Sequence, residues 1–220
     1  MKFAQALIGI LAAFFISHTS HHSPRSDTRP ITVQAQTNAA IAQSAGTQIG
    51  KTLFYDAAYV RLDYPNGDLP LERGVCADVV IRALRSQQVD LQKRVHEDMQ
   101  AHFSAYPNNW KLKRPDSNID HRRVPNLETW FQRQNKALPV TDKYSDYQPG
   151  DIVSWRLDNG LAHIGVVSLN VTPEGVPLVV HNIGAGAQEE DVLFNWKVTG
   201  HFVIFRIKRG KSQRLPNSSR

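Results

Sequence analysis

The chain has 220 residues, of which 41% are hydrophobic and 21% charged, and its formal net charge is +6 at pH 7. This length and apolar content suit one domain of ordinary size with appendages. The basic residues are dispersed apart from a C-terminal cluster, and the absence of any nucleic-acid-binding motif argues against a nucleic-acid partner. We expect a monomer whose mild positive field favours approach to a polyanionic matrix such as a bacterial envelope.

The first residues have the pattern of an export signal. Met1 and Lys2 form a short basic start, and residues 3–16 are apolar except for Gln5. Because this run is too short to span a bilayer comfortably, we interpret residues 1–22 as a signal peptide, with an uncleaved N-terminal anchor as the alternative. The expected location is periplasmic or secreted, with membrane contact only through such an anchor.

Composition divides the rest of the chain into three parts. Residues 23–38 are polar and predict a flexible linker, and residues 209–220 predict a disordered basic tail. Residues 39–208 form the expected folded domain.

The first half of this domain is predicted to be helical. Apolar spacing, an N-capping residue and a first-turn proline predict helices that begin near Ile41, Cys76, Asp90 and Pro125. The first of these should run to about Tyr59. A long irregular loop, residues 106–123, lies between the last two, and long loops inside a domain are often functional.

The chain changes character after Pro149 and Gly150. From there, runs of apolar residues predict strands over residues 151–157, 161–169, 176–183 and 200–207. The segment Asp158-Asn159-Gly160 is a strong hairpin-turn signal between the first two strands. Helices followed by a meander of antiparallel strands indicate an α+β domain.

Cys76 is the only cysteine in the chain, and it stands just after Gly74, where a helix is predicted to begin. Unpaired backbone N–H groups and the positive end of the helix dipole favour the thiolate there, as a nucleophile requires. The alternative is a small buried apolar residue. Exported proteins use cysteine mainly in disulfides, so a single unpaired thiol favours a chemical role.

A nucleophilic cysteine needs a base, and the histidines on the predicted strands are the candidates. His163 begins a half-buried strand directly after a tight hairpin, which would place a base rigidly. A surface histidine at a strand end is the alternative. His181 on the next strand can orient His163, and Asn182 competes for that role, since it too can orient an imidazole. The two side chains point to opposite faces of their strand, so only one of them can face His163.

A zinc centre is the rival use of these histidines. His163 and His181 with Asp151 or His201 would supply three ligands. None of them has the tight spacing of a typical zinc motif, so we expect neither a metal nor a cofactor.

These features together resemble a known family. A cysteine that opens a helix, then the segment from Pro149 to Trp155, then His163 on a strand, is similar to the NlpC-type cell-wall peptidases of the papain-like cysteine peptidase clan. More closely, the chain resembles the YijF-like family of bacterial exported proteins, domain-of-unknown-function family 1287. The stretches that carry this resemblance are residues 73–82, 95–99, 118–127, 149–151 and 181–184.

The resemblance implies a papain-like α+β fold, with N-terminal helices packed on an antiparallel sheet of about four to six strands. It implies Cys76 as nucleophile, His163 as base and His181 as the orienting third residue. In such enzymes a tyrosine about a dozen residues before the cysteine lines the active site, and Tyr64 is the candidate here. The implied reaction is cleavage of an amide bond in peptidoglycan stem peptides.

The sequence departs from the NlpC-type pattern in two places. Asp78 follows the cysteine closely, and it would raise the thiol pKa, contact a substrate amine, or only complement the helix dipole. The stretch 96–123 is absent from a minimal NlpC-type domain, and its charged side chains would bind substrate carboxylates and amines, unless they form only a polar surface loop. These candidates are Asp98, Asp116, Asp120, His121, Arg122 and Arg123.

Two classes of function follow. The first is an exported thiol hydrolase that acts on peptidoglycan peptides through a Cys76 acyl-enzyme, with the Cys76 N–H in the oxyanion hole and with acyl transfer as a variant. The second is a non-catalytic module that binds the cell wall or an envelope partner on the same fold.

Overall fold

The computed structural model describes residues 36–205. The expected signal peptide, nearly all of the expected linker and the C-terminal tail fall outside these residues. Within the described part, none of the helices has the length and apolar character needed to cross a bilayer.

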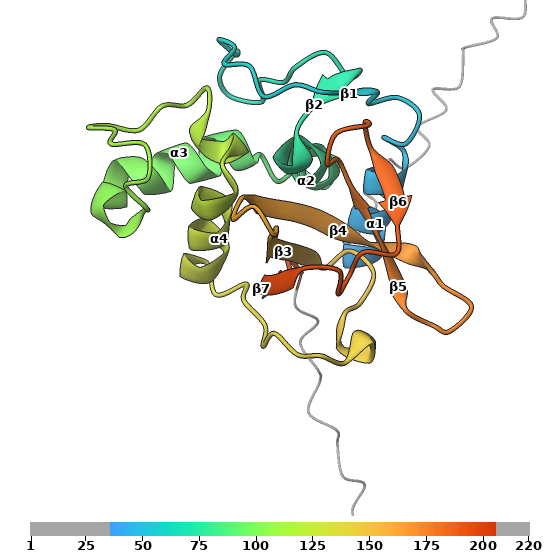
Figure 1. The fold of residues 1–220 in the computed structure, drawn as a ribbon. Coiled ribbons are helices and arrows are strands. Elements are labelled where there is room, and N and C mark those ends of the chain that lie inside the picture. Colours follow the sequence, from blue (N-terminus) through green and yellow to red (C-terminus); the bar gives the residue numbers. More distant parts are fainter. Residues whose placement is uncertain (1–35, 206–220) are drawn as a thin grey trace, which may run out of the picture. The chain divides into compact units, whose positions relative to one another are not determined.

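Helices dominate the first half of the described chain and strands the second (Figure 1). The α-helices are α1 (Asn38–Gly46), α2 (Cys76–Arg85), α3 (Leu91–His102) and α4 (Val124–Arg133). Short 3-10 turns are η1 (Phe103–Ala105), η2 (Asp120–Arg122) and η3 (Tyr144–Asp146). The strands are β1 (Phe54–Tyr55), β2 (Arg73–Gly74), β3 (Ile152–Arg156), β4 (Ala162–Val171), β5 (Pro177–His181), β6 (Gln188–Glu190) and β7 (Lys197–Phe202).

Five strands form one antiparallel sheet in the order β6-β5-β4-β3-β7, with β4 at its centre. Trp155 of β3 lies directly opposite His163 of β4. The two short strands β1 and β2 pair separately and in parallel, with Tyr55 opposite Gly74. This small pair brings Tyr55 beside the start of α2. The predicted α+β class is confirmed, and the strand number of the main sheet lies in the expected range.

The two faces of the main sheet pack against different parts of the chain. Helices α1, α2 and α4 contact β4, and Ile164 and Val166 of that strand belong to the core cluster formed with these helices. On the other face, Trp155 packs with Leu193 in a second cluster. Successive strand residues point to opposite faces. His163, which stacks on Trp155, therefore lies on the face away from the helices.

The first helix is shorter than predicted. It ends at Gly46 instead of near Tyr59, and Gly50 then turns the chain with a φ of 71°. Ile49 and Leu53, which the spacing placed on a buried stripe, are 41% and 49% exposed. Glycine disfavours a continued helix and permits the left-handed conformation observed here.

The strand predictions agree best at the centre of the sheet. β3 lies within the predicted 151–157, and β4 covers most of the predicted 161–169 but continues to Val171. β7 begins and ends earlier than the predicted 200–207. The edge strand β6 was not predicted. It has three residues, none of them fully buried, so it lacks the apolar alternation that indicates a strand.

Candidate active site

Cys76 is the first residue of α2, and the chain before it is shaped to form the helix start. Val75 is extended and precedes the helix as its N-cap, and its N–H donates to Asp78 Oδ2 at 2.7 Å. Gly74 fits because a Cβ there would lie only 3.0 Å from the Asp78 Cβ. The Asp78 carboxylate thus satisfies a backbone donor that the helix itself leaves unpaired.

The Cys76 thiol is buried, with 5% of the residue exposed. Burial raises the pKa of this thiol to about 12, although the backbone N–H of Ile164 opposes the shift and the Asp78 carboxylate adds to it. The lowered pKa expected at a helix start is not observed, because desolvation outweighs the helix dipole and the backbone donors. The resting sulfur is therefore a thiol at neutral pH.

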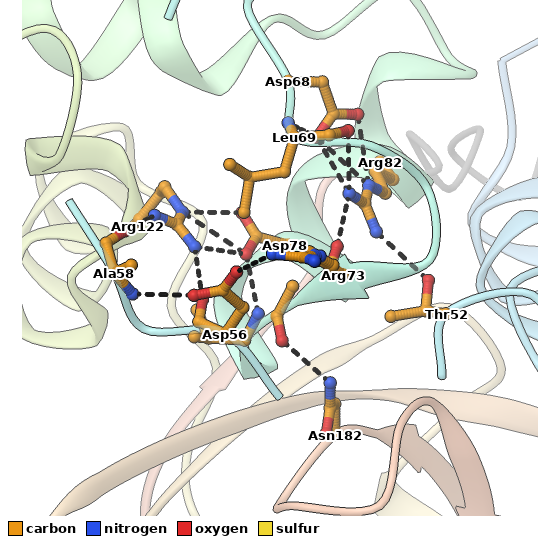
Figure 2. A network of polar contacts seen from close by, with 12 residues as sticks. Thr52, Asp56, Ala58, Asp68, Leu69, Arg73, Asp78, Arg82, Arg122 and Asn182 are labelled. Carbon is orange, nitrogen blue, oxygen red and sulfur yellow. Dashed lines mark hydrogen bonds and ion pairs between the residues drawn. The ribbon is translucent and has the colours of Figure 1, made fainter. Parts of the chain in front are cut away.

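A buried ion pair holds the start of α2 in place (Figure 2). Arg122 donates to Asp78 through Nε at 3.0 Å and Nη2 at 2.9 Å. It also donates to the carbonyl oxygens of Asp56 and Ala58, at 3.0 and 3.3 Å. The substrate-binding candidates Asp78 and Arg122 are thus each other's partners, and they tie α2, η2 and the segment after β1 together.

A second arginine of α2 shapes the loop that precedes the cysteine (Figure 2). Arg82 contacts both carboxylate oxygens of Asp68 and donates to Thr52 Oγ1 at 3.1 Å. It also donates to the Arg73 carbonyl oxygen at 2.8 Å. These bonds fix residues 67–73 against the helix, and so they fix the strand β2 from which Cys76 follows.

A cleft of about 630 Å³ opens at the start of α2. Its walls come from the segment after β1, the loop before α4, one side of α4 and the β3–β4 hairpin. Besides Cys76 and Arg122, the lining includes Tyr55, Trp110, Glu128, Arg156 and Ala162. The cleft gives a substrate of peptide size access to the neighbourhood of the thiol.

His163, His181 and Glu190 form a continuous polar array on the other face of the sheet. His163 Nε2 lies 2.9 Å from His181 Nδ1, and His181 Nε2 lies 2.9 Å from Glu190 Oε2, close but outside strict hydrogen-bond geometry. Both histidines are buried. Trp155 and Trp196 flank the His163 ring.

This array selects one tautomer for each histidine. A carboxylate only accepts, so His181 presents Nε2–H to Glu190 and keeps a lone pair on Nδ1. That lone pair accepts the Nε2–H of His163, whose Nδ1 is then left as a proton acceptor. Burial, and to a smaller extent the neighbouring His181, lowers the pKa of His163 to about 3, so His163 is neutral at physiological pH.

The thiol contacts β4 at the residue next to the predicted base. The Cys76 sulfur faces the backbone N–H of Ile164, the residue that follows His163. Within residues 36–205, no hydrogen bond joins Cys76 to the His163 side chain. Proton transfer between Cys76 and His163 therefore requires the two side chains to come closer to each other. Catalytic hydrogen bonds often tighten in this way only when substrate binds.

Tyr64 does not line the cleft. Its side chain is exposed and its ring stands edge-on to His96, with centroids 5.3 Å apart. Tyr55 lies in the cleft instead, and the pKa of its hydroxyl is raised by burial and by the nearby Cys76. The spacing of about a dozen residues before Cys76 did not indicate Tyr55, because only the pairing of Tyr55 with Gly74 brings this tyrosine to the cysteine.

Of the remaining candidates from the inserted stretch, Asp120 and Arg123 pair with each other. Asp120 is 1% exposed and accepts a bond from Arg123 at 3.1 Å, while the Arg123 guanidinium lies 4.1 Å from the centre of the Trp110 ring. His121 is buried, and burial lowers its pKa to about 3. Of these residues, only Trp110 lines the cleft.

The two alternatives for the third residue occupy different places. Asn182 donates to the Gly74 carbonyl oxygen at 3.0 Å on the helix side of the sheet (Figure 2), whereas His181 contacts His163.

The candidate zinc ligands form two separate pairs. His201 pairs with Asp151 at 2.8 Å, whereas His163 pairs with His181. Among the described residues, no group of three or more His, Cys, Asp or Glu side chains is arranged to hold a metal ion.

Sequence comparison finds close relatives of this chain. A family model described as a domain of unknown function, DUF1287, matches residues 42–204. The uncharacterized protein YijF of Escherichia coli (strain K12) is 66% identical over 207 residues, which cover 93% of this chain and 99% of YijF.

Among solved structures, NlpC1 and NlpC2 from Trichomonas vaginalis each align with a TM-score of 0.42, at 14% and 13% identity. The alignments cover 76% and 77% of this chain but only 44% and 48% of those proteins. The predicted resemblance to the YijF-like family is confirmed by the two sequence matches: the chain belongs to the DUF1287 family.

Proposed function

We propose that this protein is an exported thiol hydrolase that cleaves an amide bond in peptidoglycan stem peptides through a Cys76 acyl-enzyme. The observation that carries the proposal is the unpaired Cys76 thiol at the start of α2, which lines a cleft of about 630 Å³. The apolar start of the chain supports export, and a periplasmic or secreted location follows from it.

In the proposed reaction, Cys76 Sγ transfers its proton to Nδ1 of His163 as the sulfur attacks the amide carbon. The oxyanion accepts a hydrogen bond from the Cys76 N–H. The imidazolium returns its proton to the leaving amine as the C–N bond breaks. His163 then takes a proton from a water molecule as the water attacks the thioester carbon. The C–S bond breaks, the acid is released, and His163 returns the proton to Cys76 Sγ.

His181 and Glu190 support this reaction by holding His163. Their contacts fix which His163 nitrogen carries the proton, and the Glu190 carboxylate stabilises positive charge that reaches the histidine pair. His181 is thus an orienting residue in this scheme.

The test is mass spectrometry of purified muropeptides after incubation with the wild type, Cys76→Ala and His163→Ala. We expect a new fragment with the wild type only, whose mass identifies the bond. His102→Ala is a matched control, since the side chain of His102 is 52% exposed. The hydrolase is contradicted if Cys76→Ala produces the same fragment at the same rate.

A non-catalytic binding module is the second candidate. It is favoured by the raised pKa of Cys76 and by the lack of a hydrogen bond between this residue and His163 in the described structure. A module would bind stem peptides equally well as wild type and as Cys76→Ala, and neither protein would release a fragment.

A further inference from the structure

Arg156 stands at the end of β3, where it lines the same cleft as Cys76. Glu128 of α4 lines this cleft too, and the two side chains form a bidentate pair. Arg156 Nη1 donates to Glu128 Oε1 at 2.9 Å, and Nη2 donates to Oε2 at 2.7 Å. An end-on pair of this kind uses the outer edge of the guanidinium and fixes its plane.

The other edge of the same guanidinium is unused. Nη1 also donates to the Trp155 carbonyl oxygen and to Thr199 Oγ1, both at 3.1 Å. The Nε–H and the second Nη2–H of Arg156 have no acceptor within residues 36–205, and the side chain is 36% exposed. These two parallel N–H groups form the second fork of the guanidinium, whose spacing matches a carboxylate.

Most of the hydrogen-bonding capacity of Glu128 is used in holding this arrangement. Its Oε1 accepts from Ser154 Oγ at 2.6 Å and from Thr199 Oγ1 at 3.2 Å, in addition to Arg156. The side chain is 11% exposed, so it presents little acceptor surface to the cleft. The Arg156–Glu128 pair thus offers the cleft donors and almost no acceptors.

Arg122, the other arginine that lines the cleft, has no pair of parallel N–H groups left to bind a carboxylate. Arg122 uses Nε and Nη2 on Asp78, Nη1 on the Ala58 carbonyl oxygen, and Nη2 again on that of Asp56. Its side chain is 2% exposed. The open fork of Arg156 is therefore where this cleft can bind an anion.

We propose that Arg156 is a carboxylate-binding subsite of the cleft, oriented by Glu128. On β4, the register partner of Arg156 is Ala162. The Cys76 sulfur faces Ile164, two residues further along the same strand. A strand rises about 3.4 Å per residue, so these two backbone positions are about 7 Å apart along the strand. The role of Arg156 in selecting substrates that carry a carboxylate rests on the proposed function, whereas the binding site itself does not.

The test measures binding without turnover. N-acetylalanylalanine and its C-terminal amide are titrated into the full chain carrying Cys76→Ala, and the ¹H–¹⁵N resonance of Arg156 Nε–H is followed by NMR. We expect the acid to shift this resonance and to bind about tenfold more tightly than the amide, because it gains charge-assisted hydrogen bonds. Equal binding of acid and amide contradicts the subsite.

Two substitutions separate the fork from the charge. Arg156→Lys keeps a cation beside Glu128 but removes the fork, so most of the preference for the acid should disappear. Arg133→Lys is the matched control, because Arg133 also pairs bidentately with a carboxylate, that of Asp98, and lies outside the cleft. An unchanged preference in Arg156→Lys, or an equal loss in Arg133→Lys, would overturn the proposal.

This experiment also separates the subsite from the reaction. Acid-selective binding together with an inactive wild type would leave the subsite intact and reject the hydrolase. A wild type that cleaves muropeptides without acid-selective binding in Cys76→Ala would reject the subsite alone.

Discussion

At the scale of single residues, burial decides the chemistry of this site. Cys76 stands at a helix start, which favours the thiolate, but it is also removed from water, and burial raises its pKa to about 12. His163 is likewise buried and stays neutral, since burial lowers its pKa to about 3. The resting pair is thus thiol and imidazole, and in the proposed reaction the proton moves as the sulfur attacks.

Alkylation of Cys76 tests this resting state. The rate with iodoacetamide should rise with pH up to at least pH 10 without a plateau, because only the thiolate reacts and its pKa is about 12. Glutathione, an exposed thiol, is the reference and should level off earlier. A plateau in the native protein with a midpoint below pH 8 would show an activated thiolate instead.

Glu190 is a residue that the sequence did not single out. It lies 2.9 Å from His181 and outside the cleft, so it should act through the histidines and not by binding substrate. In muropeptide turnover, Glu190→Gln should lower kcat about tenfold and leave KM nearly unchanged.

A neighbouring carboxylate provides the control for Glu190. Glu189→Gln alters the adjacent residue of β6, whose side chain contacts Ser168 and Asn170 instead of the histidines. The ¹⁵N resonances of His181 should report a protonated Nε2 in the wild type and a changed tautomer population only in Glu190→Gln. Identical effects of the two substitutions would exclude a positioning role.

At the scale of elements, the start of α2 is held by a buried ion pair to which the helix itself contributes Asp78. The Asp78–Arg122 pair is nearly inaccessible to water, and Asp78 also accepts from the Val75 N–H. Removing one member of a buried pair leaves the other charge unpaired, which is costly. Sequence shows charge and position but not which charges meet, so the pairing of these two substrate-binding candidates could not be predicted from it.

Asp78→Asn tests the role of this pair. It should lower the free energy of unfolding by about 3–5 kcal/mol, measured by urea denaturation, because Arg122 stays buried without a counter-charge. It should also speed alkylation of Cys76, whose pKa the Asp78 carboxylate raises. Glu97→Gln breaks an exposed pair with Lys93 and should barely change stability. A stability of Asp78→Asn equal to that of Glu97→Gln would contradict this role.

The helix and strands that carry the candidate site could be predicted from the sequence. The way in which these elements meet could not. The start of α2 at Cys76 and the strands that bear His163 and His181 were recognisable from local patterns. The contact of Tyr55 with the cleft and that of Glu190 with His181 depend on pairings of the short strands β1 and β6. Such pairings are set by tertiary packing, which leaves little signal in two or three residues.

At the scale of the whole molecule, buried neutral histidines make stability depend on pH. The pKa of His121 is lowered to about 3 by burial and by Arg122 and Arg85, and that of His163 is lowered similarly. The unfolded chain binds these protons near pH 6.5, so it takes up more protons than the folded chain between about pH 3 and 6.5. Stability should therefore be fully present above that range and fall as the pH drops through it.

His121→Gln isolates one of these contributions. Between pH 7 and pH 5 the wild type should lose about 2 kcal/mol of unfolding free energy through His121 alone, and the variant should lack this loss. Urea denaturation at both pH values measures it. The same loss in wild type and variant would show that His121 is not held neutral by the fold.

The central claim is that Cys76 carries the acyl group of a cleaved peptide. Mass spectrometry of the intact protein, quenched in acid during incubation with muropeptides, tests this claim most directly. The account predicts a protein heavier by the acyl part of the substrate, with the adduct on Cys76 and neither adduct nor fragments in Cys76→Ala. Peptide fragments released equally by Cys76→Ala, with no adduct on the wild type, would contradict it.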